Sequence, residues 1–165
     1  MRYFFDTEFI ERPGTLELIS IGMVSEDRRE LYAISTEFDR RKANVFVREN
    51  VLPKLPRKTS AKGRAVWKTR AAIRDEIRAF VGDDKNPQFW AYFADYDWVL
   101  FCWLFGAMVK LPEGWPMLCL DLKQSMIERG LKREHLPPND FAHEALADAR
   151  WLRESFDIVF PPNSF

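Results

Sequence analysis

The sequence has 165 residues, 47% hydrophobic and 15% aromatic, so it can bury a core and is too apolar to be disordered. Its formal net charge is zero, which on its own argues against a nucleic-acid partner. No apolar run reaches the length of a membrane span, and the N-terminus lacks the apolar core of a signal peptide. We therefore expect a single cytoplasmic domain over residues 1–165, with no membrane contact. Cys102 and Cys119 lie in apolar runs and are expected to be reduced core residues.

Three segments rich in β-branched and aromatic residues open the chain, at 2–9, 16–24 and 30–36. The pair Pro13-Gly14 marks the first turn, and the charged residues at 26–29 mark the second. Because these connections are short, the segments predict a three-stranded antiparallel meander.

A strongly basic segment follows between Arg40 and Arg74. It contains twelve positive residues and one negative residue, so its net charge is +11 and the rest of the chain carries −11. An acidic metal site beside a basic segment would produce this division, with the basic side chains holding substrate phosphates. Arg57, Lys58 and Lys62 are the candidate phosphate contacts. The alternative is a solvated surface, the usual role of charge runs.

The remaining chain alternates strands and helices. A helix is predicted to start after Thr69, a favourable N-cap, and to end at Gly82. Asp121 followed by Gln124 resembles a capping box at the start of another helix. A meander followed by strand–helix units indicates an α/β fold, in which helices pack on a mixed sheet. The other expected elements are strands near 89–93 and 117–120 and helices over 97–108, 121–129 and 144–156.

Asp6 and Glu8 form the first acidic pair. Two residues apart in a strand, they point to the same face, about 7 Å from each other, while Thr7 and Phe9 point to the other face. Two acids on one face of a hydrophobic strand repel each other and lose hydration unless a cation lies between them. The alternative is an edge strand with that face in water, which the surrounding aromatic residues disfavour.

Asp97 is the second acidic candidate, at a strand end that turns into an apolar helix. Sites in open α/β sheets gather at such strand ends. On spacing alone, however, a plain helix cap is the favoured interpretation of Asp97. Asp121 occupies a similar junction, and there the capping box favours a structural role.

His143 and Asp148 form the third cluster. Five residues apart, they would lie about 140° apart on one helix, so His143 can join Asp148 at a site only from the turn before the helix. With two histidines in the chain, His143 is a candidate general base, and an exposed surface ring is the alternative.

Together these clusters supply four carboxylates and one base. Carboxylate oxygens suit Mg²⁺ or Mn²⁺, and two such ions about 3.5–4 Å apart can stabilise both the attacking and the leaving oxygen of a phosphate displacement. The set therefore predicts a metal-dependent nuclease in which Asp6, Glu8, Asp97 and Asp148 bind metal and His143 takes a proton from water. Thr7 and Phe9 are expected to contact the terminal nucleotide.

The order of these motifs resembles the DEDDh 3′–5′ exonucleases of the ribonuclease H-like fold. The stretches 4–9, 93–97 and 143–149 look like their three motifs and place the second ligand at Asp97, not Asp95. The runs at 6–11, 16–22, 35–39 and 51–56 look most like the small actinobacterial exoribonuclease AS type. That resemblance implies a magnesium-dependent enzyme that shortens single-stranded RNA from its 3′ end, prefers adenylate-rich tails and forms a homodimer. Phe93 replaces an asparagine common in the second motif, so contacts made by that asparagine cannot be transferred.

Two alternatives remain open from the residues alone. The first is a DNA exonuclease of the same fold, because the contacts that would read a 2′-hydroxyl are not identifiable in the sequence. The second is a nucleic-acid-binding module that no longer cleaves. The complete set of four acids and a histidine argues against that second alternative.

Overall fold

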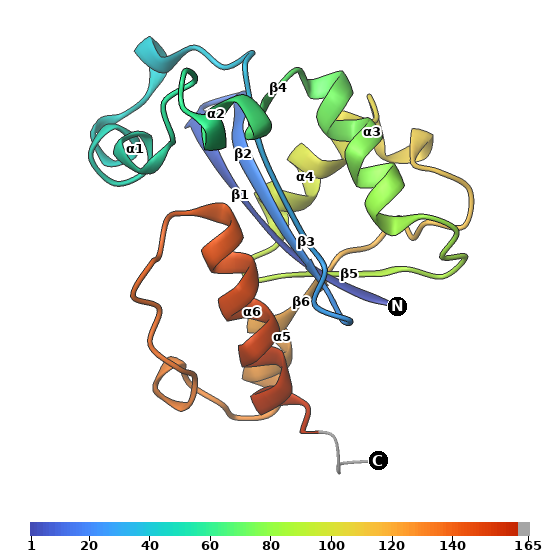
Figure 1. Cartoon of the computed structure of the whole chain (residues 1–165). Helices are drawn as coiled ribbons and strands as arrows, with labels where there is room; N and C mark the ends of the chain where they lie inside the picture. Colours follow the sequence, from blue (N-terminus) through green and yellow to red (C-terminus); the bar gives the residue numbers. More distant parts are fainter. Residues whose placement is uncertain (162–165) are drawn as a thin grey trace.

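The computed structural model describes residues 1–161 and has an α/β fold built on a six-stranded mixed sheet, as predicted (Figure 1). The strand order is β4-β3-β2-β1-β5-β6. Pairing is antiparallel between β1, β2 and β3 and parallel between β1 and β5, β5 and β6, and β3 and β4. The arrangement is that of a ribonuclease H-like fold. The strands are β1 Arg2–Arg12, β2 Thr15–Ser25, β3 Glu30–Ser35, β4 Trp67–Lys68, β5 Gln88–Ala91 and β6 Leu120–Asp121.

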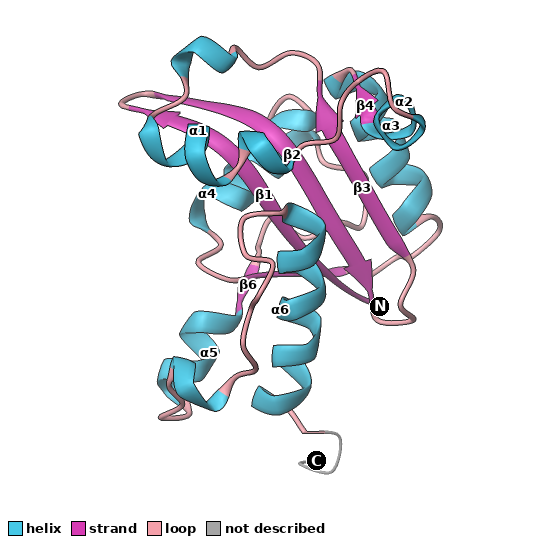
Figure 2. Cartoon of the chain, turned by 60° about the vertical axis from the view of Figure 1, so that its left-hand side comes forward, coloured by secondary structure: helices cyan, strands magenta, loops and turns pink. Residues whose placement is uncertain are grey.

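Helices cover both faces of the sheet (Figures 1 and 2). On one face, α3 and α4 pack on the core side chains of the central strands, including Phe5, Ile21 and Met23. On the other face, α5 and α6 pack around Phe4 and Trp90. The helices are α1 Val45–Asn50, α2 Ala61–Val66, α3 Arg70–Val81, α4 Asp95–Leu104, α5 Leu122–Glu128 and α6 Ala145–Val159. Short 3₁₀ helices are η1 Arg40–Lys42, η2 Leu52–Lys54, η3 Met108–Lys110 and η4 Arg133–His135.

The meander and two helix caps agree with the sequence predictions. Thr69 caps α3 by accepting a hydrogen bond from the backbone N–H of Ala72, and Gly82 ends this helix with a φ of +63°. Asp121 caps α5 by accepting from the N–H groups of Lys123 and Gln124.

Other boundaries were predicted incorrectly. The helix expected over 97–108 begins at Asp95 and ends at Leu104, because Gly106 takes a φ of +96° that an α-helix cannot contain. The strand expected over 117–120 is only two residues long, and Met117 and Leu118 before it are exposed. The strand expected near 89–93 stops at Ala91, ahead of Phe93, whose φ is +59°.

The basic segment contains structure that the sequence did not predict. It folds into α1 and α2 with short 3₁₀ turns, and β4 joins the edge of the sheet beside β3. A small apolar cluster packs α1 against β1 and β2. Its members are Ile10, Ile19, Ala43, Val47 and Val51. Within residues 1–161, no helix is both long and apolar enough to cross a membrane.

Candidate active site

A pocket of about 630 Å³ lies where β1, α1, α4 and the start of α6 meet. All five residues predicted for catalysis line it: Asp6, Glu8, Asp97, His143 and Asp148. Thr7 and Phe9 line it as well. Segments far apart in the sequence therefore bring the predicted side chains into one cavity.

Asp6 and Glu8 lie on the face of β1 that α6 covers. Their cross-strand neighbours on β2 are Gly22 and Ser20. A Cβ atom at Gly22 would lie 2.3 Å from the backbone nitrogen of Leu146, so only glycine lets the first turn of α6 approach the sheet this closely. This approach brings Asp148 to the pair, and one carboxylate oxygen from each of Asp6, Glu8 and Asp148 lies within 4.8 Å of the other two.

Both carboxylate oxygens of Asp148 accept hydrogen bonds from the loop before α6. Asn139 donates from Nδ2 to Oδ1 at 2.5 Å, and the backbone N–H of His143 donates to Oδ2 at 2.7 Å. His143 thus lies in the turn before the helix, which is the only position from which the spacing allowed it to join Asp148. Asn139 was not identified from the sequence, because a proline-rich loop gives no local signal of this contact.

Asp97 reaches the site from α4. It is not the N-cap of that helix, a position that Ala94 occupies, but lies in its first turn. β5 pairs with β1 only as far as Phe4, which leaves the backbone N–H of Thr7 without a strand partner on that side. This N–H and the Thr7 hydroxyl donate to Oδ1 of Asp97 at 2.8 and 2.5 Å. The side chain of Thr7 therefore orients the second predicted ligand.

Burial and mutual repulsion disfavour the charged form of these acids. Desolvation, followed by the charges of Asp97, Asp148 and Glu8, raises the pKa of Asp6 well above its usual range. Desolvation and the neighbouring carboxylates raise the pKa of Glu8 to about 8. Burial raises the pKa of Asp97 to about 7, against the lowering effect of the Thr7 hydrogen bonds. Burial likewise raises the pKa of Asp148. Four such groups in one pocket require a cation if all are to be ionised at neutral pH.

The donor set fits a hard divalent cation. It consists of carboxylate oxygens, which suit Mg²⁺ or Mn²⁺ better than the thiolate or imidazole ligands that softer metals prefer. The two cysteines take no part: both are free thiols, and burial raises the pKa of Cys102 to about 11. Cys102 is buried in the core as predicted, whereas Cys119 is only partly buried and packs against that core.

His143 has an unusual backbone and one aromatic neighbour. Its φ is +67°, a region that residues with side chains rarely occupy. Its ring lies edge-on to that of Phe46 on α1, with centroids 4.9 Å apart and planes at 87°. His143 lines the same pocket as the acids.

Other polar and aromatic side chains of the pocket were not identified in advance. They include Asn44, Phe46, Tyr92, Tyr96, Arg133 and Trp151. Asp121, by contrast, has the structural role expected of it, since besides capping α5 it accepts a hydrogen bond from the N–H of Ala94 at 3.0 Å.

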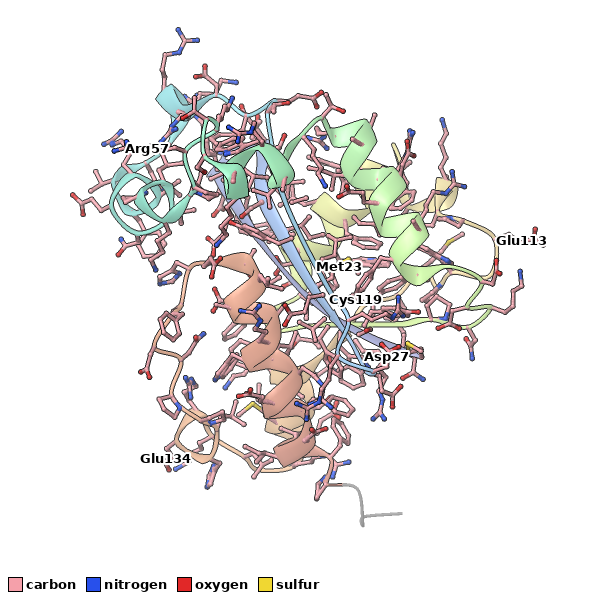
Figure 3. The ribbon with its side chains drawn as sticks, in the orientation of Figure 1. Met23, Asp27, Arg57, Glu113, Cys119 and Glu134 are labelled. Atoms are coloured by element: carbon pink, nitrogen blue, oxygen red, sulfur yellow. The ribbon has the colours of Figure 1, made fainter. Side chains whose placement is uncertain are left out.

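The three basic candidates lie outside the described pocket lining. Arg57 and Lys58 come just before α2 and Lys62 lies within it, at the end of the molecule that also holds α1 (Figure 3). The Lys58 ammonium lies 4.6 Å from the centre of the Trp67 ring, a cation–π contact. These three side chains therefore do not line the pocket that contains the acids.

A ribonuclease H-like sheet that gathers acids from β1, α4 and α6 into one pocket defines a DEDDh-type nuclease. Residues 1–160 match the family model of the 3′-5′ exoribonuclease Rv2179c-like domain. The chain belongs to this exoribonuclease family, which confirms the resemblance seen in its motifs. Two relatives come from Mycobacterium tuberculosis: 3′-5′ exoribonuclease MT2234.1 of strain CDC 1551 / Oshkosh and 3′-5′ exoribonuclease Rv2179c of strain ATCC 25618 / H37Rv. Each is 46% identical over 161 residues, which cover 96% of this chain and 93% of the relative.

Proposed function

We propose that this protein is a metal-dependent 3′–5′ exoribonuclease that hydrolyses the terminal phosphodiester of single-stranded RNA and releases nucleoside 5′-monophosphates. The observation that carries this proposal is the convergence of Asp6, Glu8 and Asp148 within 4.8 Å, in a pocket that also contains Asp97 and His143. Membership of an exoribonuclease family supports RNA as the substrate.

Asp6, Glu8, Asp97 and Asp148 would hold two Mg²⁺ ions, for which Mn²⁺ could substitute. When bound, such ions supply positive charge to the attacking and leaving oxygens of the phosphate. The protein's own contribution is to orient the ligands. Thr7 fixes Asp97 through two hydrogen bonds, and Asn139 with the His143 N–H fixes both oxygens of Asp148.

His143 is the proposed general base. Its imidazole takes a proton from the attacking water, the water oxygen bonds to phosphorus, and the bond from phosphorus to the 3′ oxygen breaks on the opposite side. The 3′ oxygen leaves with the shortened RNA and acquires a proton, while the phosphate stays on the released nucleotide. A positioned base of this kind contributes roughly 10²–10⁴-fold to turnover.

The terminal nucleotide would lie against Thr7 and Phe9, with Phe9 as a stacking surface. Phe9 is packed edge-on against Tyr96, with ring centroids 5.7 Å apart, so its orientation is fixed before substrate arrives. Arg57, Lys58 and Lys62 would hold phosphates farther along the strand. Stacking on aromatic rings tolerates every base. The proposed preference for adenylate-rich tails therefore rests on the resemblance of the motifs to the exoribonuclease AS type.

Labelled substrates test the activity directly. RNA and DNA of varied sequence, labelled at the 3′ or the 5′ end, are incubated with Mg²⁺ or with chelator. The proposal expects mononucleotides released first from the 3′ end of RNA, only with metal, and fastest from adenylate tails. Faster release from DNA would make the protein a DNA exonuclease, and binding without release would make it a non-cleaving module.

We also propose a homodimer of single-domain subunits in the cytoplasm. Exposed apolar side chains gather along the segment that ends at the sheet-edge strand β6, and such patches are typical of subunit contacts. They are Trp103, Met108, Val109, Met117 and Leu118. The free thiols of Cys102 and Cys119 are consistent with a reducing compartment. Light scattering on the purified protein tests the dimer, and Val109→Glu should dissociate it.

A further inference from the structure

Two residues of the basic segment contact the loop that carries His143. Phe46 on α1 places its ring edge-on against the imidazole. Lys54, the last residue of η2, donates a hydrogen bond from Nζ to the carbonyl oxygen of Ala142. Phe46 therefore contacts the ring of His143, and Lys54 contacts the backbone just before it.

The peptide group between Ala142 and His143 is bonded at both ends. Its carbonyl accepts from Lys54, and its N–H donates to Oδ2 of Asp148. The φ of +67° at His143 is sparsely populated for a residue with a side chain, so it persists only where the surroundings hold it. Loop residues 136–142 just before it contain no helix or strand, so side-chain contacts must supply that support.

The two supporting residues project from a rigid base. Ala43, Val47 and Val51 are at most 5% exposed and pack against Ile10 and Ile19 of the sheet. Closely packed branched side chains have few alternative arrangements, so α1 and η2 keep a fixed position relative to β1.

We propose that Phe46 and Lys54 are positioning residues, which hold the His143 imidazole toward the carboxylates of the pocket. The basic segment then contributes to turnover as well as to RNA binding. This inference rests on the proposed role of His143 as the base. The positive charge of Lys54 partly opposes the rise in the pKa of Glu8 that burial and the neighbouring carboxylates cause.

A double-mutant cycle tests the proposal. Lys54→Met keeps the unbranched aliphatic part of the side chain and removes the donor, and it should lower kcat roughly 10- to 100-fold with little change in KM, as expected for a misplaced base. In a His143→Ala background the same substitution should have no further effect on kcat, because no base remains to be positioned. Phe46→Leu should behave in the same way. Lys85→Met, at an exposed site between α3 and β5, is the matched control.

NMR spectroscopy of the metal-free protein gives a second readout. The chain has two histidines, so the ring protons of His143 and His135 are separately assignable. Lys54→Met should shift the His143 ring signals, because the imidazole moves relative to the Phe46 ring, and should leave those of His135 unchanged. Circular dichroism and thermal unfolding establish that each variant is folded.

The outcomes separate this proposal from the proposed function. Normal turnover in His143→Ala would refute the base, while the NMR shift would still report whether Lys54 holds the ring. If His143→Ala has low turnover but the NMR ring signals of His143 do not shift in Lys54→Met, the positioning role is refuted and the role of the base is not. An equal rise in KM in both backgrounds would show that Lys54 contacts RNA phosphate instead.

Discussion

Thr7 donates both its backbone N–H and its hydroxyl to one oxygen of Asp97. The contact exists because β5 leaves β1 after Phe4 and the freed N–H must find another acceptor. Because the two strands separate here, Thr7 can orient the carboxylate of Asp97, on α4, toward the pocket. Thr7 lies between Asp6 and Glu8 in the sequence. A single stretch of β1 therefore supplies two acids and orients a third.

Removing the Thr7 hydroxyl tests this arrangement. Thr7→Val keeps the shape of the side chain and leaves Asp97 with one hydrogen bond instead of two. Metal affinity, measured by calorimetry, should fall roughly 10-fold or more, the usual effect of losing a group that orients a ligand. Thr7→Ser retains the hydroxyl and should bind metal nearly as well as the unmodified protein. Equal affinity in Thr7→Val and Thr7→Ser would contradict the orienting role.

Replacing the proposed base should slow catalysis without weakening metal binding. His143→Ala should lose roughly 10²–10⁴-fold in turnover, because a positioned proton acceptor is removed, while the carboxylate ligands remain. His135→Ala is the control, since His135 is exposed and bonds the backbone of Lys132. Turnover in His143→Ala equal to that of the unmodified protein would refute the proposed base.

Neutralising Asp6 should lower the activity but raise the thermal stability of the metal-free protein. Asp6→Asn should abolish cleavage and weaken metal binding, yet raise the thermal midpoint of the metal-free protein, since it relieves repulsion from Glu8, Asp97 and Asp148. Differential scanning fluorimetry with chelator measures the midpoint, and mononucleotide release measures the activity. Normal cleavage by Asp6→Asn would refute the metal site.

The local parts of this fold were predictable because local chemistry determines them. Segments rich in β-branched and aromatic residues, joined by short turns, predicted the meander. Thr69 and Asp121 predicted two helix starts, and the five-residue spacing required His143 to precede α6. The two acids of β1 were predictable because a two-residue strand spacing sets their common face.

Long-range contacts were not predictable from the same patterns. That Gly22 admits the backbone of α6 depends on a helix more than 120 residues away. Asn139, Phe46 and Lys54 reach the site through the tertiary fold, and no periodicity signals that. α1 was missed because its six residues form a helix too short to show a clear period, stabilised mainly by packing on Ile10 and Ile19.

Charge reversal in the basic segment should affect binding more than chemistry. Changing Arg57, Lys58 and Lys62 to glutamate should raise KM for long RNA and flatten the dependence of KM on salt. With fewer phosphate contacts, fewer counterions are released when RNA binds. The kcat at saturating RNA should change little, since these residues lie outside the pocket. Reversal of Lys85 and Lys110, which are exposed elsewhere on the surface, is the control. An unchanged salt slope would identify the segment as ordinary solvated surface.

The stability of the metal-free protein should fall as pH rises. In the unfolded chain aspartate and glutamate titrate near pH 4, whereas folding raises the pKa of Glu8 to about 8 and that of Asp97 to about 7 and also raises those of Asp6 and Asp148. Between these limits the folded state binds more protons than the unfolded state, so the free energy of unfolding decreases with increasing pH. Carboxylates with lowered pKa, such as Asp39 at about 2, finish titrating below this window and cannot offset the trend.

Thermal unfolding in chelator should therefore show a midpoint that drops steadily between about pH 5 and pH 8. Saturating Mg²⁺ should remove most of this slope, because the bound cation stabilises the ionised acids of the folded state. Asp6→Asn should flatten the slope in chelator, and Asp39→Asn should lower the midpoint by a similar amount at every pH in the range. Repeating the series in His143→Ala separates the acids from any contribution of that imidazole. A midpoint independent of pH without metal would mean that the four carboxylates are hydrated and do not form a closely coupled cation site.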